Sequence, residues 1–571
     1  MNESLPQADR NPQGGLPSWV FALGLSLLAS LAVLLPFFWL GSASGHDFEF
    51  HVASWLDVAY QWKQGVLYPR WTAWTNYGFG EPRYIFYPPL SWMLGAALSL
   101  LLPISWAPAA FILFTQTLAG MSAFFLLRRL TTIRAAYLGA AFYAANPYAL
   151  VVSYVRSDFA EQLACAIFPL LLLAALRLAG LLEEERPKLS AVTLFALPFA
   201  AVWLCNAPAG VIASYSMTLL FAWATLAQRS WRIAARAIAA LALGFGLAGF
   251  YLLPAAYEQR WVNIGQALSS GLQPTQNFLF TRMDDPEHTW FNWMFSFCAT
   301  ALILLAALTA LASRRFARNA DRSRASHSAW GVLLVLGIAT SLMMIRLTTP
   351  LWNLLPKLRF VQFPWRWMSI LALVCCCFLT AAIEHRRGWL WFVLVVVLAV
   401  PLGWFLTQNT WWDPDEMGAQ KAAITNGTGY EGVDEYDPLD DDHLDLPKHA
   451  PLATILLADP EDTDDKPPGA KIQIETWQPD KKKILVESSA SARVAMRLVN
   501  YPAWRVEVNG KRVIPEKPDD TNQMLVPVAA GKSEIQIRFA RTSDRSAGIA
   551  LSLFSMLIGI GLLGSRRPLK T

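Results

Sequence analysis

Charged residues are scarce in this chain, and motifs that mark several classes of soluble protein are missing. Only 16% of its 571 residues are charged, whereas an average soluble domain carries about 25%. No Gly-rich nucleotide-binding loop is recognisable. The net charge of +5 is too small to indicate a nucleic-acid partner. The composition therefore argues against a soluble enzyme and against a nucleic-acid-binding protein.

Cysteine is also rare, and its positions fit neither a metal site nor a disulfide framework. The six cysteines lie in apolar stretches and show no CxxC spacing: Cys165, Cys205, Cys298, Cys375, Cys376 and Cys377. A structural zinc site needs paired cysteines at short spacing. We therefore interpret all six as small hydrophobic residues that face other helices or lipid.

Long apolar runs are abundant in the chain. Hydrophobic residues make up 54% of it, and its mean hydropathy is +0.33. A spanning helix needs about 20 apolar residues, and twelve runs meet or approach that length: 18–40, 107–127, 135–152, 159–179, 190–206, 208–228, 234–253, 291–312, 329–346, 367–384, 389–407 and 547–564. The sequence predicts a mainly α, polytopic membrane protein with about 12–13 transmembrane helices.

Basic segments between the runs predict which ends face the cytoplasm. They are 128–134, 229–236, 313–324, 386–387 and 566–570. With twelve spans, all of these segments fall on one side, so both ends of the chain are expected in the cytoplasm. The first run is longer than the apolar core of a signal peptide, and we interpret it as an uncleaved anchor.

Residues 89–103 are apolar but too short to span a membrane, and prolines bound them. A full crossing here would place Arg128 and Arg129 outside. We expect a re-entrant or interfacial helix, and the alternative is a thirteenth, partial span.

Three long segments face the outside under this topology: 41–88, 254–290 and 408–546. We divide the chain into a membrane domain (1–407) with the first two loops, an extracytoplasmic part (408–546), and a final helix with a cytoplasmic tail (547–571). Because these three long polar segments lie on the same face of the bundle, we expect the active site on that face.

The extracytoplasmic part combines an acidic stretch with a strand-rich region. Residues 413–446 are acidic and are either a cation site or a solvated, partly disordered linker. Alternating patterns then predict strands at 471–477, 492–499, 504–508, 511–513, 524–528 and 533–539. Asn509–Gly510 is a strong hairpin signal, and the turn 529–532 separates the last pair of strands. We predict a small antiparallel, β-sandwich-like module.

An amphipathic helix is expected directly after the first span. Its apolar face comprises Phe48, Val52, Trp55, Leu56 and Ala59, and its other face carries His51, Asp57 and Gln61. Gly65 is a good residue to end it.

Asp47 precedes this helix and has two interpretations. In the first it is an N-cap that accepts a backbone N–H of the first turn. In the second it is a general base for a substrate hydroxyl, since His46 and His51 flank it just outside the membrane.

Several segments resemble a bacterial membrane-protein family named for a domain related to 6-pyruvoyl-tetrahydropterin synthase. They are GHDFEFH at 45–51, GVLYPRW at 65–71, NYGFGEPRYIFYPPL at 76–90, YVRSDFAEQ at 154–162, QFPWRW at 362–367 and NYPAWRVEVNGKRV at 500–513. That family belongs with the GT-C glycosyltransferases. The resemblance therefore implies a GT-C-type helical bundle.

The resemblance also implies an activity. It implies inverting transfer of a sugar from a polyprenyl-phosphate-type lipid to an extracytoplasmic glycan, lipid or protein acceptor. Asp47 would be the catalytic base, on the outer face of a multi-pass protein of the bacterial inner (cytoplasmic) membrane. Many GT-C enzymes carry a tandem acidic pair, whereas Phe48 follows Asp47 here.

Arginines at the outer ends of two spans are expected to bind the donor phosphate. Arg156 and Arg366 suit this role because a guanidinium matches phosphate in a fork. The alternatives are an ion pair between Arg156 and Glu161, and an ordinary interfacial position for Arg366.

The predicted substrate-binding set is His46, His51, Tyr87, Arg156, Glu161, Glu258 and Arg366. Glu258 has an alternative as a surface partner of Arg260, and Tyr87 has one as an aromatic-belt residue. His288 lies among acidic residues without diagnostic ligand spacing. No cofactor or metal is therefore assigned, and a divalent metal is left open.

Two other classes of function compete with the glycosyltransferase. A lipid or glycolipid transporter or flippase would place ionisable groups near the membrane midplane, whereas here they cluster at outer span ends. A non-catalytic scaffold that presents its β module is the third hypothesis.

Overall fold

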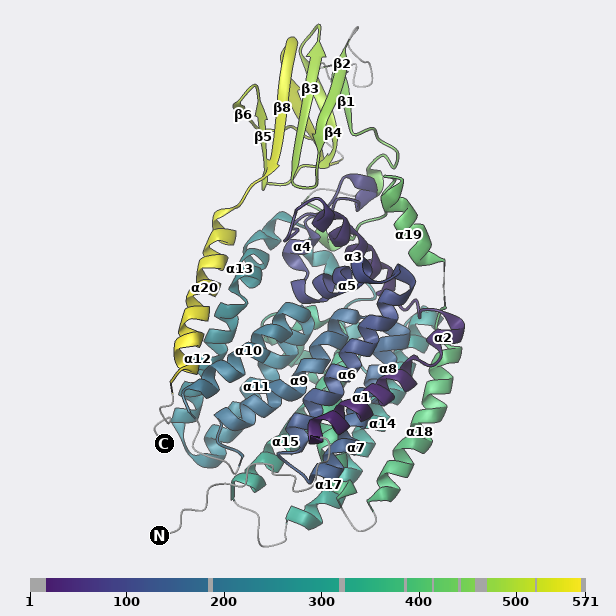
Figure 1. The fold of residues 1–571 in the computed structure, drawn as a ribbon, viewed down its shortest axis with the longest axis vertical. Helices are drawn as coiled ribbons and strands as arrows, with labels where there is room; N and C mark the ends of the chain where they lie inside the picture. Colours follow the sequence, from purple (N-terminus) through teal and green to yellow (C-terminus); the bar gives the residue numbers. More distant parts are fainter. Residues whose placement is uncertain are drawn as a thin grey trace.

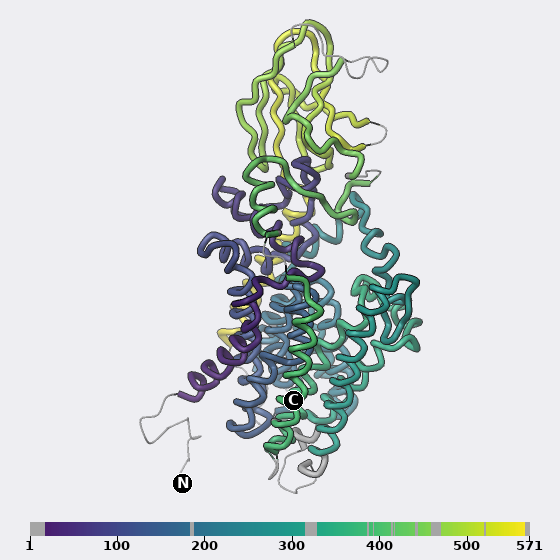
Figure 2. The backbone as a smooth tube through the Cα atoms, turned by 90° about the vertical axis from the view of Figure 1, so that its right-hand side faces the viewer, coloured from purple at the N-terminus to yellow at the C-terminus, as the bar shows by residue number. Residues whose placement is uncertain are grey.

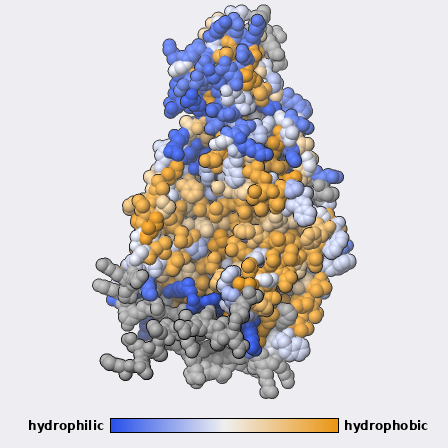
Figure 3. All heavy atoms as spheres, viewed as in Figure 1, coloured by the Kyte–Doolittle hydropathy of each residue, from blue (hydrophilic) through white to orange (hydrophobic). Residues whose placement is uncertain are grey.

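The computed structural model describes residues 17–182, 188–317, 324–384, 388–412, 415–439, 443–457, 470–518 and 521–565. A helical bundle carries a β module at one end, and a layer of short helices lies between them (Figure 1). Figure 2 shows the same layers after a quarter turn. The surface of the bundle is a broad apolar belt, whereas the β module is hydrophilic (Figure 3).

All twelve runs predicted to span are helical. The bundle comprises α1 (Ser18–Leu34), α6 (Ala107–Leu127), α7 (Ile133–Ala144) continued by α8 (Pro147–Val151) and η3 (Val152–Arg156), α9 (Phe159–Leu178), α10 (Ser190–Cys205), α11 (Ala207–Gln228), α12 (Trp231–Leu247), α14 (Pro286–Ala317), α15 (Arg324–Met343), α17 (Met368–Ile383), α18 (Trp389–Gln408) and α20 (Ser543–Leu563). Within the described residues, nine helices are long and apolar enough to cross a membrane, or eleven if two bent pairs count as spans. The prediction of a polytopic helical protein is confirmed, but the described residues offer fewer candidate spans than the 12–13 expected, and α10 is among the shorter apolar helices.

The predicted span 234–253 is not one straight helix. It bends by 76° between α12 and α13 (Gly249–Glu258). Helix α20 packs against the bend, because Ser552 Oγ accepts the backbone N–H of Phe250 at 2.8 Å. A Cβ at Gly246 would lie only 2.1 Å from Ser555 Oγ, so the small residue permits this close packing.

The intermediate layer contains α2 (Phe37–Leu40), α3 (Phe48–Lys63), α4 (Arg83–Phe86), α5 (Pro89–Leu101) and α19 (Glu416–Thr425) (Figure 1). A further short helix, α16 (Thr349–Leu354), contacts η8 (Leu358–Val361). Helix α5 has 13 residues, and at about 1.5 Å per residue it is too short for a hydrocarbon core of roughly 30 Å. It packs against α3. The segment 89–103 therefore does not cross the membrane as a single helix.

Helix α3 departs from the prediction on its polar face. His51, Asp57 and Gln61 are buried rather than solvated. Asp57 accepts the backbone N–H of Ala73 at 2.7 Å, and Gln61 donates to the carbonyl of Trp71 at 2.7 Å. The first outer loop folds back over the helix, so a face that looks solvent-exposed in the sequence binds the loop backbone.

The β module is a sandwich of two antiparallel sheets, as predicted. One sheet has the order β1 (Ala453–Leu457), β4 (Ala492–Val499), β7 (Gln523–Val528), and the other has the order β2 (Lys471–Trp477), β3 (Lys481–Ser488), β8 (Gly531–Phe539), β5 (Trp504–Val508), β6 (Lys511–Val513). Asn509 and Gly510 join β5 to β6 with φ values of 51° and 75°. These two positive φ angles confirm the predicted hairpin.

The last two strands do not pair with each other. The turn 529–532 crosses from one sheet to the other, because β7 pairs with β4 while β8 pairs with β3 and β5. The apolar faces of both sheets share one core with Trp71, Phe79, Ile85 and Phe86 of the first outer loop. That loop is therefore packed into the base of the β module.

The described part of the acidic stretch is folded, not a solvated linker. Tyr430 pairs with Trp74 through a backbone hydrogen bond of 3.0 Å. The carboxylate of Glu81 accepts the N–H of Val433 at 3.1 Å. This stretch covers the first outer loop. The predicted cytoplasmic segments 386–387 and 566–570, and residues 318–323 of the segment 313–324, lie outside the described residues.

Candidate functional site

Two backbone segments far apart in the sequence meet where α3 begins. His46 and Asp47 donate their backbone N–H groups to the carbonyls of Val155 and Arg156, at 3.1 and 2.8 Å. A Cβ at Gly45 would lie 2.4 Å from the Val155 oxygen, so only glycine fits here. This contact fixes the side chain of Asp47 beside that of Arg156.

Asp47 forms an ion pair at the surface of the protein. Its Oδ2 contacts both Nε of Arg156, at 3.2 Å, and Nη2 of the same guanidinium. Its Oδ1 lies 2.9 Å from His46 Nδ1. Within the described structure the Asp47 side chain makes no N-cap hydrogen bond to α3, so the N-cap interpretation is wrong. Arg156 is buried, while the Asp47 side chain is 23% exposed and reachable from outside.

Asp47 is ionised in this arrangement. Burial alone would raise the pKa of its carboxyl group, but Arg156 and His46 outweigh burial and hold the pKa well below its usual value. A carboxylate with so low a pKa is a weak base. Arg156 must therefore loosen its contact before Asp47 can accept a proton.

Asp158 links the two predicted arginines. Its Oδ2 lies 3.3 Å from Arg156 Nη2 and 3.5 Å from Arg366 Nη2. Its Oδ1 accepts the backbone N–H of Glu161 at 2.9 Å, which caps the start of α9. One carboxylate thus holds two guanidinium groups side by side where α9 begins.

Glu161 pairs with Arg366 rather than with Arg156. Arg366 Nε lies 3.4 Å from Glu161 Oε2, and the hydroxyl of Tyr148 donates to Glu161 Oε1. Arg366 also donates from Nη1 to the carbonyl of Val361 at 3.1 Å. Arg366 is therefore buried and bound on several sides, unlike an ordinary interfacial arginine.

Some polar atoms of this cluster lack hydrogen bonds. Among the described residues, Arg156 Nη1, Arg366 Nε and Glu161 Oε2 are buried and have no hydrogen-bond partner. Buried donors are seldom left unsatisfied in native proteins. Arg366 Nε and Glu161 Oε2 face each other at 3.4 Å as an ion pair. Arg156 Nη1 is therefore the guanidinium nitrogen of this cluster that has no acceptor among the described residues, and it is placed to donate to an oxygen atom of a ligand.

Aromatic rings form one wall beside the arginines. The Arg156 guanidinium lies 5.2 Å from the ring of Phe363 and 5.1 Å from that of Trp365. Cation–π contacts of this kind hold an arginine in place without neutralising its charge. Phe363 also lies 5.2 Å from the Arg366 guanidinium, so the two arginines share one aromatic support.

The rings of Tyr87 and His51 lie next to each other, with their centroids 5.8 Å apart. Burial raises the pKa of Tyr87 well above its usual value, and the negative charges of Asp158 and Asp47 add to this effect. Tyr87 therefore keeps its proton and is a hydrogen-bond donor. His51 Nε2 lies 3.6 Å from Asp158 Oδ1. The structure thus brings together His46, Asp47, His51, Tyr87, Arg156, Glu161 and Arg366.

Glu258 belongs to a different cluster. Its carboxylate accepts Nε and Nη2 of Arg545 at 2.7 and 2.8 Å, and the hydroxyl of Tyr501 at 2.7 Å. Because Glu258 is fully buried, the surface pair with Arg260 is wrong. Arg260 instead stacks on the ring of Tyr257 at 3.8 Å. Glu258 joins α13, the β module and α20.

Sequence reasoning missed the central position of Asp158 and the part played by Tyr148. In the structure Asp158 caps the start of α9. Only the fold shows that its second oxygen faces both arginines. Tyr148 follows Asn146–Pro147, which caps a short helix, and nothing local marks its hydroxyl as a partner of Glu161.

The acidic residues around His288 form a helix start rather than a ligand set. Asp285 accepts the backbone N–H groups of Glu287 and His288, at 3.0 and 3.3 Å. His288 Nε2 lies 2.8 Å from Asn277 Oδ1. Within the described ranges, no group of three or more His, Cys, Asp and Glu side chains is arranged to hold a metal ion.

Comparison with known families agrees with the motifs in the sequence. Residues 84–412, more than half of the chain, match the family described as 6-pyruvoyl-tetrahydropterin synthase related domain, membrane protein. The chain belongs to this family, and the family prediction is confirmed. No curated protein matches the sequence significantly.

Several solved structures are similar at low identity. The oligosaccharyltransferase of Archaeoglobus fulgidus in the apo form is 14% identical with a TM-score of 0.42, covering 71% of this chain and 56% of that one. AglB of the same organism, in complex with an inhibitory peptide and a dolichol-phosphate, is 13% identical with a TM-score of 0.41 and the same coverage. ArnT from Cupriavidus metallidurans bound to undecaprenyl phosphate is 13% identical with a TM-score of 0.31, covering 63% and 77% of the two chains.

The solved structures are similar over only part of their length. This chain spans little more than half the length of the two oligosaccharyltransferase chains. At these identities and TM-scores the likeness supports no statement about substrates. The activity has to be inferred from the cluster around Asp47 and Arg156.

Proposed function

We propose that this chain is a GT-C-type membrane glycosyltransferase that uses a polyprenyl-phosphate-type sugar donor and acts on an extracytoplasmic acceptor. One observation carries the proposal. The partly exposed carboxylate of Asp47 lies against Arg156, and both Arg156 and Arg366 have a buried nitrogen without a hydrogen bond among the described residues. A phosphate-linked sugar at this position lies next to a base, Asp47, and to two guanidinium groups that can bind its phosphate.

The donor phosphate binds between the two arginines. Its oxygens accept from Arg156 Nη1, which has no acceptor among the described residues, and from Arg366 Nε, where the phosphate competes with Glu161 Oε2 at 3.4 Å. A phosphate competes with Asp47 for Arg156, and charge-assisted contacts to phosphate are strong. Binding of the donor therefore weakens the Arg156–Asp47 contact, and the pKa of Asp47 rises as that contact is lost.

The freed carboxylate of Asp47 then accepts the proton of the acceptor hydroxyl. The hydroxyl oxygen forms a bond to the anomeric carbon as the bond from that carbon to the phosphate oxygen breaks. The electron pair of the broken bond leaves with the phosphate, whose charge Arg156 and Arg366 stabilise. Because attack comes from the side opposite the leaving group, the anomeric configuration inverts.

An apolar cavity offers space for the polyprenyl chain. It has a volume of about 500 Å³ and its lining includes Leu31, Phe37, Trp106 and Leu113. It also reaches Gly41 and Ser42, in the segment that leads from α2 to Asp47. A lipid in this cavity approaches the cluster from the apolar belt of the bundle (Figure 3).

The experiment measures release of undecaprenyl phosphate by the purified full-length protein. The donors are undecaprenyl-phosphate-linked glucose, mannose and aminoarabinose, and the acceptor is a bacterial cell-envelope extract. Asp47→Asn is expected to lower the rate at least about 100-fold, as for loss of a general base. Glu49→Gln is the matched control, because Glu49 is an exposed carboxylate two residues away and should retain activity.

A transporter gives a different result in the same preparation. It would move the lipid-linked sugar across a liposome membrane with the sugar–phosphate bond intact. Movement of the donor without release of undecaprenyl phosphate, unaffected by Asp47→Asn, would overturn the proposed activity.

A further inference from the structure

A second cavity lies at the far end of α3 from Asp47. It has a volume of about 690 Å³ and is bounded by the first outer loop, α12, α13, α20 and the base of the β module. Gln61 lines it and lies fourteen positions after Asp47, or about 21 Å at the α-helical rise. This cavity is therefore separate from the candidate catalytic cluster.

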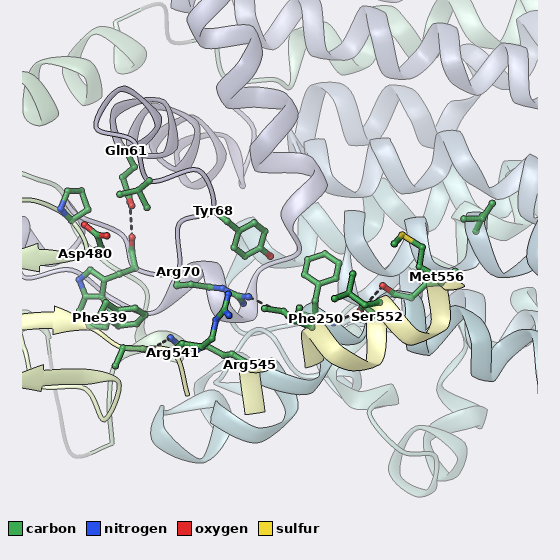
Figure 4. A pocket seen from close by; sticks show the side chains of 18 residues that line it. Gln61, Tyr68, Arg70, Phe250, Asp480, Phe539, Arg541, Arg545, Ser552 and Met556 are labelled. Carbon is green, nitrogen blue, oxygen red and sulfur yellow. Dashed lines mark hydrogen bonds between the residues drawn. The ribbon is translucent and has the colours of Figure 1, made fainter. Parts of the chain in front are cut away.

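Arginines dominate the polar part of its wall. Arg70, Arg541 and Arg545 line the cavity, and the only carboxylate among its lining residues in the described chain is Asp480. Figure 4 shows the three arginines between Asp480 and Phe539 on one side and Phe250, Ser552 and Met556 on the other. The wall thus has a cationic region next to an apolar one.

Arg545 has a carboxylate partner, whereas Arg70 contacts an aromatic ring and a backbone carbonyl. Arg545 is bound through two nitrogens to the buried carboxylate of Glu258. Arg70 lies above the ring of Tyr68 at 4.4 Å and donates to the carbonyl of Phe250 at 3.5 Å. Its Nη1 is buried and, in the described part of the chain, has no hydrogen-bond partner. Burial lowers the pKa of Arg70 on balance; Tyr68 raises it, Arg545 lowers it, and the charges of Glu258 and Asp544 raise it.

The apolar part of the cavity opens toward the belt of the bundle. Leu197, Leu553 and Met556 line it and are 48%, 52% and 45% exposed. They belong to α10 and α20, two helices of the apolar bundle. A ligand that fits both regions has an anionic head and a hydrocarbon chain, because neither region alone supplies the other kind of contact.

We propose that this cavity binds an anionic membrane phospholipid, with its phosphate between Arg70 and Arg541 and its chains along Leu197, Leu553 and Met556. The guanidinium groups receive a phosphate in fork geometry. The β module and α20 both contribute to the cavity, so the bound lipid holds the module against the membrane domain. This inference does not depend on the proposed glycosyltransferase activity.

The test titrates delipidated full-length protein in neutral detergent and counts bound lipids by native mass spectrometry. The ligands are phosphatidylglycerol and phosphatidylcholine with identical chains, and inorganic phosphate. Phosphatidylglycerol is expected to bind at least tenfold more tightly than phosphatidylcholine, whose choline compensates the phosphate charge. Equal binding of the two lipids would overturn the proposal. Inorganic phosphate that binds as tightly as phosphatidylglycerol would also overturn it, because the chains would then contribute nothing.

Variants locate the bound lipid. Arg541→Gln should abolish the preference for phosphatidylglycerol, and since Arg541 is exposed this variant is expected to fold normally. Arg70→Gln should have the same effect. If loss of the contact to Phe250 unfolds Arg70→Gln, the result for Arg541→Gln alone tests the proposal. Arg505→Gln removes an exposed arginine of β5 and should leave the preference intact. Loss of the preference in Arg366→Gln but not in Arg541→Gln would place the lipid at the other site and overturn the proposal.

Discussion

Arg156 binds Asp47 through two guanidinium nitrogens, Nε and Nη2, which both donate to the same carboxylate oxygen, Oδ2. These residues are 109 positions apart in the sequence, and backbone hydrogen bonds between their segments fix the pair. The pair keeps Asp47 ionised and weakly basic until a competing anion reaches Arg156.

Arg156→Gln is expected to change the pH dependence of the residual activity. Without Arg156, only His46 still opposes the effect of burial, so the pKa of Asp47 rises. Wild-type Asp47 stays ionised at neutral and mildly acidic pH. In the variant, kcat/KM should fall as the pH decreases through the raised pKa, because only the ionised carboxylate accepts a proton.

The check is a pair of profiles of kcat/KM between about pH 5 and pH 8, the range where shifted carboxyl groups titrate. Parallel profiles for wild type and Arg156→Gln would contradict the pairing as the cause of the low pKa.

Arg366→Lys is expected to raise the KM for the lipid-linked donor by roughly tenfold to a hundredfold. This factor corresponds to the binding free energy lost with one charge-assisted hydrogen bond. A lysine keeps the charge but cannot face Glu161, Asp158 and a phosphate with separate nitrogens. Arg359→Lys, at an exposed position of the same segment, is the control. An unchanged donor KM in Arg366→Lys would remove Arg366 from the phosphate fork.

Glu258→Gln is expected to destabilise the protein, because it leaves Arg545 buried without its ion-pair partner. Breaking such a buried pair costs about 3–5 kcal/mol. Thermal unfolding in detergent measures this loss. Replacing both Glu258 and Arg545 with methionine should restore most of the stability, since no unpaired charge then remains. A melting temperature equal to that of wild type in Glu258→Gln would show that the pair contributes nothing to stability.

The fold was largely accessible from the sequence where local pattern determines structure. Apolar runs of sufficient length predicted every helix of the bundle. In lipid the backbone N–H and C=O groups must bond to each other, and a single segment achieves this as a helix. Asn509–Gly510 predicted its hairpin because two positive φ angles are required in that turn. The proximity of Asp47, Arg156 and Arg366 followed from their common place at the outer ends of spans.

The rest depended on contacts between distant segments. Glu258 meets Arg545 across 287 residues, and no local signal connects them. The polar face of α3 is buried because the loop returns over it, and an isolated amphipathic pattern predicts the opposite. β7 and β8 are adjacent in sequence but lie in different sheets, since a short turn serves equally for a hairpin and for a crossing between sheets.

Asp57 is expected to make the protein less stable as the pH rises from about 4 to about 7. Burial raises the pKa of its carboxyl group from 3.8 to about 7 in the folded protein. Between these values the folded state binds the proton and the unfolded chain does not, so stability falls with increasing pH. Asp57→Asn removes this titration. Its altered hydrogen bonds change the stability by an amount that does not depend on pH.

The melting temperature of Asp57→Asn relative to wild type should therefore increase from about pH 5 to about pH 8, the interval that contains most of this titration. A difference that stays constant over the interval would show that Asp57 does not titrate there.

A structure of the full-length protein with undecaprenyl phosphate bound is the sharpest test of the proposed donor site. We expect the phosphate within hydrogen-bond distance of Arg156 Nη1 and Arg366 Nε, with the Asp47–Arg156 contact lengthened and the Asp47 carboxylate open to solvent. A phosphate bound elsewhere, with the contact between Asp47 and Arg156 intact, would refute the proposed site.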